Sequence, residues 1–343
     1  MGVRTQSLNK MTLSFLLGIW IFSGVGGFEQ SIAQRFPGIN SFNNRPAAFQ
    51  VQRFRPWSDS NGLFQTESAR TNDALQTSIA LFTHFSSTPL TITSMKGSQP
   101  VISEQLGLDI IVAVGLLPWL EVSIAAPATL FQTGDHRLLM KTFLVQFLDI
   151  NGFAMADLRF GAKFGFTNQR EHGVELGLRL EVTAPTGDSQ RFNGEDGVSF
   201  SAALLLSRSY YGFNFAMNLG YRKMPASTIA DLLIEHELFY SFGLSYLLQN
   251  KQLMFLVDFL GFRTLNTSLE NSFAPEVLLG MRIYPSKQVP LGLSIGGSFS
   301  TLTTILRFGH LPTTPYGFPV YRFFLGIVWR SSGQGKDKRE NGR

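Results

Sequence analysis

The sequence predicts an all-β fold: a transmembrane antiparallel β-barrel of about twelve strands, with short turns at one end and long loops at the other. Three observations predict it. Apolar and polar residues alternate in many segments, the connections between those segments alternate in length, and aromatic residues gather beside the short connections. A soluble β-sandwich also alternates, but it gives no reason for the other two observations.

The clearest alternation lies in residues 157–183. From 157 to 166 the even positions are apolar, from Leu158 to Phe166, and the odd positions carry charge or glycine. After a polar turn at 167–173, residues 174–183 repeat the pattern. Period two on both sides of a turn predicts an antiparallel hairpin. In a membrane barrel the apolar face meets lipid and the polar face lines the lumen.

The same hairpin gives a predicted register. If the turn centres near Arg170, paired residue numbers sum to about 340. Arg159 is then expected opposite Glu181, and Gly161 opposite Arg179. Directly opposed residues on one face lie about 4.5–5.5 Å apart at Cβ. We therefore expect an ion pair between Arg159 and Glu181 inside the lumen.

The same pattern, read along the whole chain, places the other strands. Residues 75–85 open the barrel, with Leu75, Ile79, Leu81 and Phe85 outward. Prolines then mark a loop, and Pro118 turns the chain from the second strand to the third. The predicted strands are 75–85, 105–116, 120–126, 157–166, 174–183, 198–207, 213–222, 237–247, 253–262, 276–284, 291–300 and 320–329.

Connection lengths assign the two ends of this barrel. Long connections follow every odd-numbered strand, among them 127–152, 185–197 and 301–319, and short turns follow the even-numbered ones. Outer-membrane barrels have short periplasmic turns and long external loops. An even strand number then leaves both ends of the barrel on the periplasmic side.

Aromatic residues and glycines agree with this arrangement. Amphipathic rings gather at a membrane boundary, which predicts a periplasmic aromatic belt of Trp119, Phe166, Tyr210, Tyr211, Tyr246, Tyr284 and Trp329. Glycines fall repeatedly on the inward face, where a narrow barrel is crowded and strongly curved. The 32 Phe and 33 Gly of the chain fit an oily exterior and a crowded interior.

Segments outside the barrel have other compositions. Residues 1–33 resemble a secretory signal peptide, with Arg4 and Lys10, an apolar run from Met11 to Val25, and a small-residue cleavage site near Ala33. We expect 34–74 to be a periplasmic leader, whose entry into the lumen the sequence leaves open. Residues 75–330 form the predicted barrel, and 331–343 a charged, disordered tail.

Charged side chains on the inward face are the main polar feature. The predicted lumen-lining residues are Asp109, Glu121, Asp157, Arg159, Lys163, Glu175, Arg179, Glu181, Arg222, Asp258, Glu276, Arg282 and Arg322. Positive and negative charges nearly balance. Burial in a narrow lumen requires pairing or water. Two alternatives remain open: an ion-pair network that stiffens the barrel, or a hydrated passage whose charges tune ion selectivity.

Several motifs resemble the N-terminal barrel of OmpA-family proteins from Gram-negative bacteria. They are 117–122 (LPWLEV), 157–159 (DLR), 185–188 (PTGD) and 317–322 (GFPVYR). The resemblance covers roughly residues 42–330 and implies a barrel in the outer membrane. The peptidoglycan-binding domain of that family is absent after the barrel, so its cell-wall role is not expected here. PTGD also resembles a motif of barrels regarded as exporters of aromatic compounds.

Composition and residue spacing exclude other function classes. The net charge of +5 comes mainly from the two ends, so no nucleic-acid partner is expected. With no cysteine and five scattered histidines, the sequence predicts neither a metal site nor a cofactor. His236 lies beside Glu235 and Glu237 at a strand mouth, where solvated charges are expected.

We therefore expect a non-enzymatic barrel of the outer membrane, in contact with its lipid and monomeric because closure leaves no free edge. Its predicted function is that of a small porin-like passive channel for small solutes, or of a structural barrel with a charge-lined lumen. The alternatives are a surface-exposed binding or adhesion protein that acts through its long external loops, and an exporter of small hydrophobic compounds.

Overall fold

A computed structural model describes residues 48–57, 63–94, 97–135, 150–229, 232–248, 252–265, 273–286, 290–299 and 319–331. The expected signal peptide, most of the expected tail and most of the loops at 127–152 and 301–319 lie outside the described residues. No helix within the described ranges is long and apolar enough to cross a membrane.

In the described part of the chain, thirteen strands form one sheet. Their bounds are β1 Thr77–Ser94, β2 Gly97–Leu117, β3 Leu120–Gly134, β4 Ala154–Met155, β5 Leu158–Gly165, β6 Glu175–Ala184, β7 Ser199–Tyr210, β8 Phe213–Ile229, β9 Leu232–Leu247, β10 Leu253–Thr264, β11 Phe273–Ile283, β12 Leu291–Phe299 and β13 Tyr321–Arg330. A helical turn, α3 (Gln169–His172), joins β5 to β6, and the short 3-10 helix η1 (Ser189–Arg191) lies before β7.

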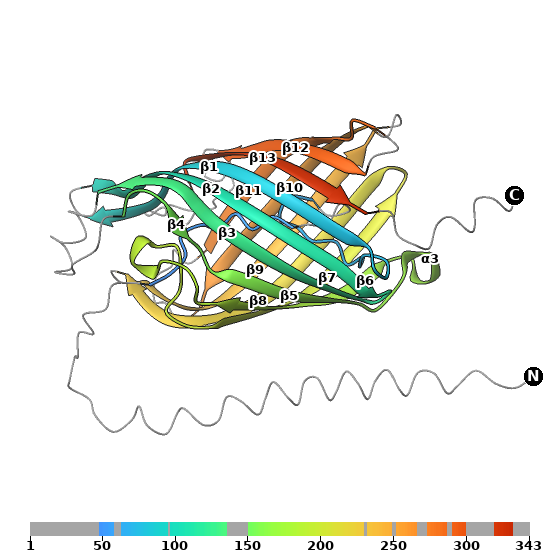
Figure 1. Cartoon of the computed structure of the whole chain (residues 1–343), viewed down its shortest axis with the longest axis horizontal. Coiled ribbons are helices and arrows are strands. Elements are labelled where there is room, and N and C mark those ends of the chain that lie inside the picture. Colours follow the sequence, from blue (N-terminus) through green and yellow to red (C-terminus); the bar gives the residue numbers. More distant parts are fainter. Residues whose placement is uncertain are drawn as a thin grey trace, which may run out of the picture. The chain divides into compact units, whose positions relative to one another are not determined.

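The sheet closes on itself. Neighbouring strands pair antiparallel in chain order, and β1 pairs with β13 from Ser78 opposite Arg330 to Ser87 opposite Tyr321. The two-residue β4 only extends the edge of β3, so twelve strands make up the barrel wall (Figure 1). The prediction of a closed, twelve-stranded antiparallel barrel is confirmed.

Some strands are longer than the alternation indicated. The predicted loop between 85 and 105 is mostly strand, because β1 and β2 continue pairing up to Ser94 opposite Gly97. Its prolines are accommodated where register shifts follow Ser87 and Leu90, and bulges tolerate a missing N–H donor. β8 and β9 also extend beyond the expected ends, across an irregularity after Lys223.

The predicted register of the β5–β6 hairpin is wrong by two residues. Arg159 lies opposite Thr183, Gly161 opposite Glu181 and Lys163 opposite Arg179. The turn between the two strands takes up this two-residue difference, because it contains the helical turn α3. α3 begins after Asn168, whose side chain accepts the N–H of Arg170, and it ends at Gly173, which has the left-handed conformation. Arg159 therefore pairs with a different partner.

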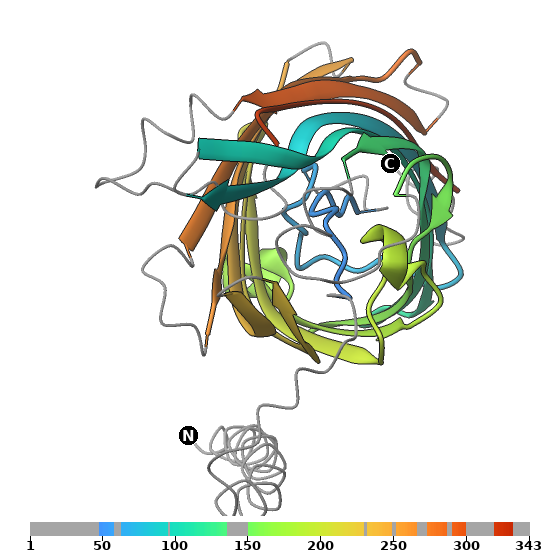
Figure 2. The same ribbon diagram turned by 90° about the vertical axis from the view of Figure 1, so that its left-hand side faces the viewer.

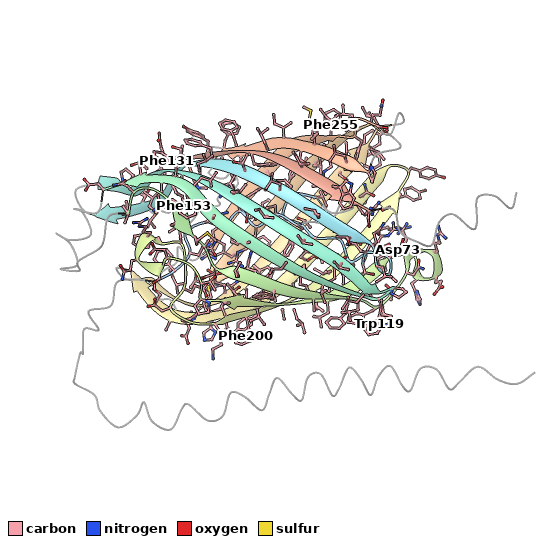
Figure 3. All side chains as sticks on the ribbon, viewed as in Figure 1. Asp73, Trp119, Phe131, Phe153, Phe200 and Phe255 are labelled. Carbon is pink, nitrogen blue, oxygen red and sulfur yellow. The ribbon has the colours of Figure 1, made fainter. Side chains whose placement is uncertain are left out.

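Outward and inward faces follow the alternation. Large apolar side chains such as Phe160, Leu204 and Leu325 are 46%, 57% and 54% exposed on the outside. Figure 3 shows Phe200 and Phe255 projecting from the outer surface of the wall. Charged residues of the same strands are buried inside. This apolar exterior around a polar interior is the arrangement of a membrane barrel.

The segment before β1 lies inside the barrel. We call its described residues, 48–57 and 63–76, the lumen segment; Figure 2 shows its first part, in blue, within the ring of strands. It starts where Val51 N donates to Phe192 O, in the β6–β7 loop, and reaches the short-turn end where Leu75 N donates to Gly115 O. Of residues 34–74, expected as a leader, the described residues up to Ala69 contribute to the barrel interior, whereas Arg70, Asp73 and Ala74 are exposed at the short-turn end.

Apolar residues of the lumen segment are built into the core. Phe54, Leu63 and Phe64 are almost fully buried and pack with Phe82 and Phe324 of the wall. Glycine makes room for them: a Cβ at Gly280 would lie 2.8 Å from the Phe64 ring, and one at Gly243 would lie 2.7 Å from Leu63. The wall is shaped to hold this segment.

The lipid-facing assignment predicts a charge penalty at Phe160. Phe160→Arg should reduce the free energy of unfolding in bilayers by roughly 2–4 kcal/mol, because a midplane arginine must leave water. Phe160→Leu, which keeps the position apolar, is the matched control and should cost far less. Urea-dependent unfolding in lipid vesicles measures both. An equal loss for the two variants would contradict the outward assignment of Phe160.

Candidate functional site: the filled lumen

The charged residues predicted to line the lumen lie on its wall. All of them are buried except Glu175, which is half-buried and accepts a hydrogen bond from Ser207 Oγ at 2.8 Å. Many of them contact the lumen segment. Four such contacts, described below, hold this segment along its length.

The first contact lies nearest the long-loop end. Arg53 of the lumen segment donates from Nη1 and Nη2 to the two carboxylate oxygens of Glu237, at 3.0 and 2.8 Å. Arg222 of β8 approaches the same carboxylate at 3.4 Å. Glu237 is 0% exposed. The expectation of a solvated charge there is wrong, because the lumen segment covers the strand mouth and supplies a guanidinium.

The second contact is a chain of ion pairs across the β3–β5–β6 wall. Arg55 lies 3.4 Å from Glu181, and Arg179 lies 3.3 Å from the same carboxylate. Glu67 of the lumen segment is 3.2 Å from Arg179 and 3.3 Å from Lys163. Lys163 also lies 3.3 Å from Glu121 of β3. Three carboxylates therefore serve three cations, and one of these carboxylates, Glu67, comes from the lumen segment itself.

The third contact surrounds Asp109 of β2. Gln52 donates to its Oδ2 at 3.0 Å, and Arg159 donates to its Oδ1 at 3.3 Å. His84 lies 3.5 Å from the same carboxylate. Asp109 is 0% exposed. An ion pair between directly opposed Arg159 and Glu181 was expected. In the observed register Arg159 lies opposite Thr183, and its guanidinium donates to Asp109.

The fourth contact binds backbone rather than side chain. Consecutive N–H groups of Phe64, Gln65 and Thr66 donate to one carboxylate oxygen, Oδ2 of Asp258, at 2.9, 2.7 and 3.2 Å. Asp258 is fully buried on β10. Three donors on one anion form a tight turn of the segment around a wall charge.

Remaining members of the charged set pair within the wall or with the lumen segment. Arg322 lies 3.1 Å from Glu276, Glu121 accepts from Asn72 N at 2.8 Å, and Arg282 donates to Leu63 O at 3.3 Å. Asp157 accepts the N–H groups of Gly187 and Glu195. It thereby ties the β6–β7 loop to the start of β5.

Most residues of the expected aromatic belt lie on the outside near the short turns. Trp119, Phe166, Tyr210, Tyr211 and Trp329 are exposed, and Tyr246 packs against Phe213 with ring centroids 4.5 Å apart. Figure 3 shows Trp119 at the short-turn end, opposite Phe131 and Phe153. Tyr284 differs: it packs against the interior cluster of Phe54, because Arg282 and Tyr284 share the inward face.

Sequence reasoning did not identify the residues of the lumen segment. Gln52, Arg53, Arg55 and Glu67 carry no alternation that would assign them to a strand or a site. The inward glycines were the available signal, since they mark where the wall leaves room. Among the described residues, no group of three or more His, Asp or Glu side chains is arranged to hold a metal.

Glu237 provides a test of how firmly the lumen segment is held. Glu237→Gln should destabilise more than Arg53→Met, because the first leaves two buried guanidiniums without their carboxylate and the second leaves Glu237 with Arg222. Breaking a buried pair costs about 3–5 kcal/mol, so we expect the glutamate variant to fall in that range. Unfolding in vesicles measures both variants.

The exposed Arg191–Asp188 pair, whose side chains are 31% and 38% exposed, is the matched control. Its coupling, measured in a double-mutant cycle, should stay below about 1 kcal/mol. If Glu237→Gln cost no more than Arg53→Met, Glu237 would not be the shared partner of both arginines.

Comparisons with known proteins agree with the barrel. The COG4313 outer membrane channel from Pseudomonas putida F1 is similar with a TM-score of 0.55 at 11% identity, over 77% of this chain and 98% of that chain. The NanC porin aligns over 74% of this chain and 98% of its own, with a TM-score of 0.48 at 8% identity. At these identities the likeness concerns the fold. No curated protein matches the chain.

A family model described as "Putative MetA-pathway of phenol degradation" matches residues 78–305. The match begins in β1, takes in β2 to β12 and leaves out the lumen segment. It covers more than half of the 343 residues. This match, and not the resemblance of single motifs to OmpA-family barrels, shows the family of the chain. The chain belongs to the family described as Putative MetA-pathway of phenol degradation.

Proposed function

We propose that the protein is a passive channel for small solutes in the outer membrane of a Gram-negative bacterium, and that the lumen segment controls its opening. One observation carries the proposal. The polar lumen is filled by a chain segment that has no strand pairing with the wall, together with inward side chains of the wall itself. A barrel with a purely structural role can fill a narrow interior from its strands alone.

The contacts of the lumen segment with the wall would allow the segment to move out of the lumen. Most of its polar contacts to the wall involve side chains, as in the Arg53–Glu237 and Asp258 contacts. Such groups can exchange their partners for water when the segment moves, whereas strand pairing would make it part of the wall. The interior left behind would be lined by both signs of charge, which suits weakly selective passage of hydrated solutes.

Space on the short-turn side also fits a channel. A cavity of about 590 Å³ opens there, lined by both the lumen segment (Leu63, Ser68, Arg70) and the wall (Glu175, Arg330). This volume is in the range of cavities that hold small molecules. A solute entering from this side would meet the lumen segment at Leu63, so movement of the segment would open the path.

The proposed orientation puts short turns in the periplasm and long loops outside. It rests on loop asymmetry, the exposed rings near the short turns and the apolar outer face. A signal peptide removed near Ala33 would direct the chain to the periplasm. A closed wall has no free edge, which favours a monomer. We also propose that the motifs resembling those of OmpA-family barrels indicate a relationship to those barrels.

A disulfide lock tests whether the lumen segment must move. The Oγ atoms of Ser68 in the segment and Ser207 in β7 lie 3.3 Å apart. The chain has no cysteine of its own, so Ser68→Cys with Ser207→Cys introduces a single possible bond with little change in volume. Single-channel recordings should show openings in the wild type, none in the oxidised double variant, and openings again after reduction.

Each single-cysteine variant is the control, and it should conduct under both conditions. Openings that persist in the oxidised double variant would show that solutes pass around a fixed segment. A wild type without openings at any voltage would favour the structural barrel instead. The remaining alternative, a binding protein acting through its loops, would also lack openings.

Labelling of intact cells tests the orientation. An epitope tag in the β6–β7 loop, between Pro185 and Gly197, should be reached by antibody on whole cells, because this loop lies at the proposed external end. A tag at 167–173, around α3, should be reached only after the outer membrane is permeabilised. The opposite pattern would invert the proposed topology.

A further inference from the structure

A second, smaller cavity lies between the lumen segment and the wall. It has a volume of about 100 Å³. The lumen segment lines it with Arg53, Arg55 and Trp57 among others, and β6 and β8 line it with Arg179 and Arg222. The family match does not cover the lumen segment, so one side of this cavity belongs to a part of the chain that the family model leaves out.

Cations outnumber anions around this cavity. Four guanidinium groups line it, those of Arg53, Arg55, Arg179 and Arg222, against the two carboxylates of Glu67 and Glu181. Both carboxylates are already engaged: Glu181 with Arg55 and Arg179, and Glu67 with Arg179 and Lys163. Arg53 and Arg222 share a third carboxylate, that of Glu237, which does not line the cavity. The cavity wall itself therefore presents more guanidinium than carboxylate groups.

Hydrogen-bond donors around the cavity lack acceptors. Nε of Arg55, Nε of Arg179 and Nε2 of Gln65 are buried and have no hydrogen-bond partner among the residues that the structure describes. All three side chains line the cavity. A buried donor without an acceptor is destabilising, and more so when the donor is charged. An acceptor that enters the cavity removes this cost.

We propose that the cavity is a binding site for a small inorganic monoanion, of the size and charge of a halide. An anion accepts hydrogen bonds from these N–H groups and lies beside the guanidinium groups that outnumber the carboxylates on the cavity wall. Because one water needs about 10–15 Å³ of such space, the cavity holds a halide with part of its hydration shell. A cavity of this volume is too small for a larger organic anion.

A cation is disfavoured at the same place. The aromatic face most able to attract one, that of Trp57, already carries Arg179, whose Cζ lies 4.1 Å from the ring centroid. This stacking also makes Trp57 a reporter, because the indole lies directly at the site. The proposal concerns binding in the filled lumen and holds whether or not the barrel conducts.

Quenching of Trp57 fluorescence tests the site. In purified full-length protein, the other tryptophans (Trp20, Trp119 and Trp329) are replaced by Phe. Iodide is then titrated at constant ionic strength, with caesium as the cationic quencher. We expect saturable quenching by iodide, competition by bromide, and no saturable quenching by caesium.

Two variants separate the site from general accessibility. Arg55→Gln should raise the iodide concentration that gives half-maximal quenching (the midpoint) at least tenfold. Gln65→Leu should also raise this concentration, although it removes no charge. Arg70→Gln, which changes an exposed arginine at the other cavity, is the matched control and should leave the midpoint unchanged. Circular dichroism and heat-modified gel mobility confirm that each variant barrel is folded.

Linear quenching by iodide, equal in all variants, would overturn the proposal, because it would mean collision and not binding. Saturable quenching that Arg70→Gln weakens as much as Arg55→Gln would overturn it as well, since it would place the anion at the short-turn mouth. If Arg55→Gln does not fold, Gln65→Leu alone decides: an unchanged midpoint in that variant contradicts the site.

Discussion

The structure depends on how the inward charges of a closed barrel are satisfied. Asp109, Lys163 and Asp258 are each 0% exposed, and a charge that far from water requires a partner. Wall residues supply some partners, but neighbouring strands offer only the positions that the register brings together. The lumen segment supplies most of the others. The wall stabilises the lumen segment, and the lumen segment stabilises the interior of the wall.

The exterior and the set of inward charges follow from the alternation because a strand has a strict period of two. Once Phe160 is outward, Arg159 and Gly161 must be inward. The ends of strands do not follow in this way. Pro89 and Pro100 indicated a loop, yet bulges let β1 and β2 continue past them. The β5–β6 register failed for a related reason, since a capped helical turn takes up residues that a simple turn would not.

Partners of the inward charges were beyond prediction for a different physical reason. They lie on a segment without strand periodicity, and their contacts join residues far apart in sequence, as between Arg53 and Glu237. Nothing local to either residue encodes that meeting. Positions such as Gly243 and Gly280 carry part of the information, because the space they leave matches Leu63 and Phe64. Only the folded barrel shows which side chains occupy it.

The path of the lumen segment constrains how the molecule is assembled. The segment runs through the interior and continues directly into β1, and β1 forms the closing seam with β13, the last strand to be made. If the seam zips up around a segment already lying against the open sheet, its buried charges are paired before water is excluded. If the seam closes first, a segment with several charged side chains must thread a finished ring, against the cost of desolvating each charge. The chain order therefore favours a barrel that is wrapped around its contents, with the segment acting as an internal template for closure.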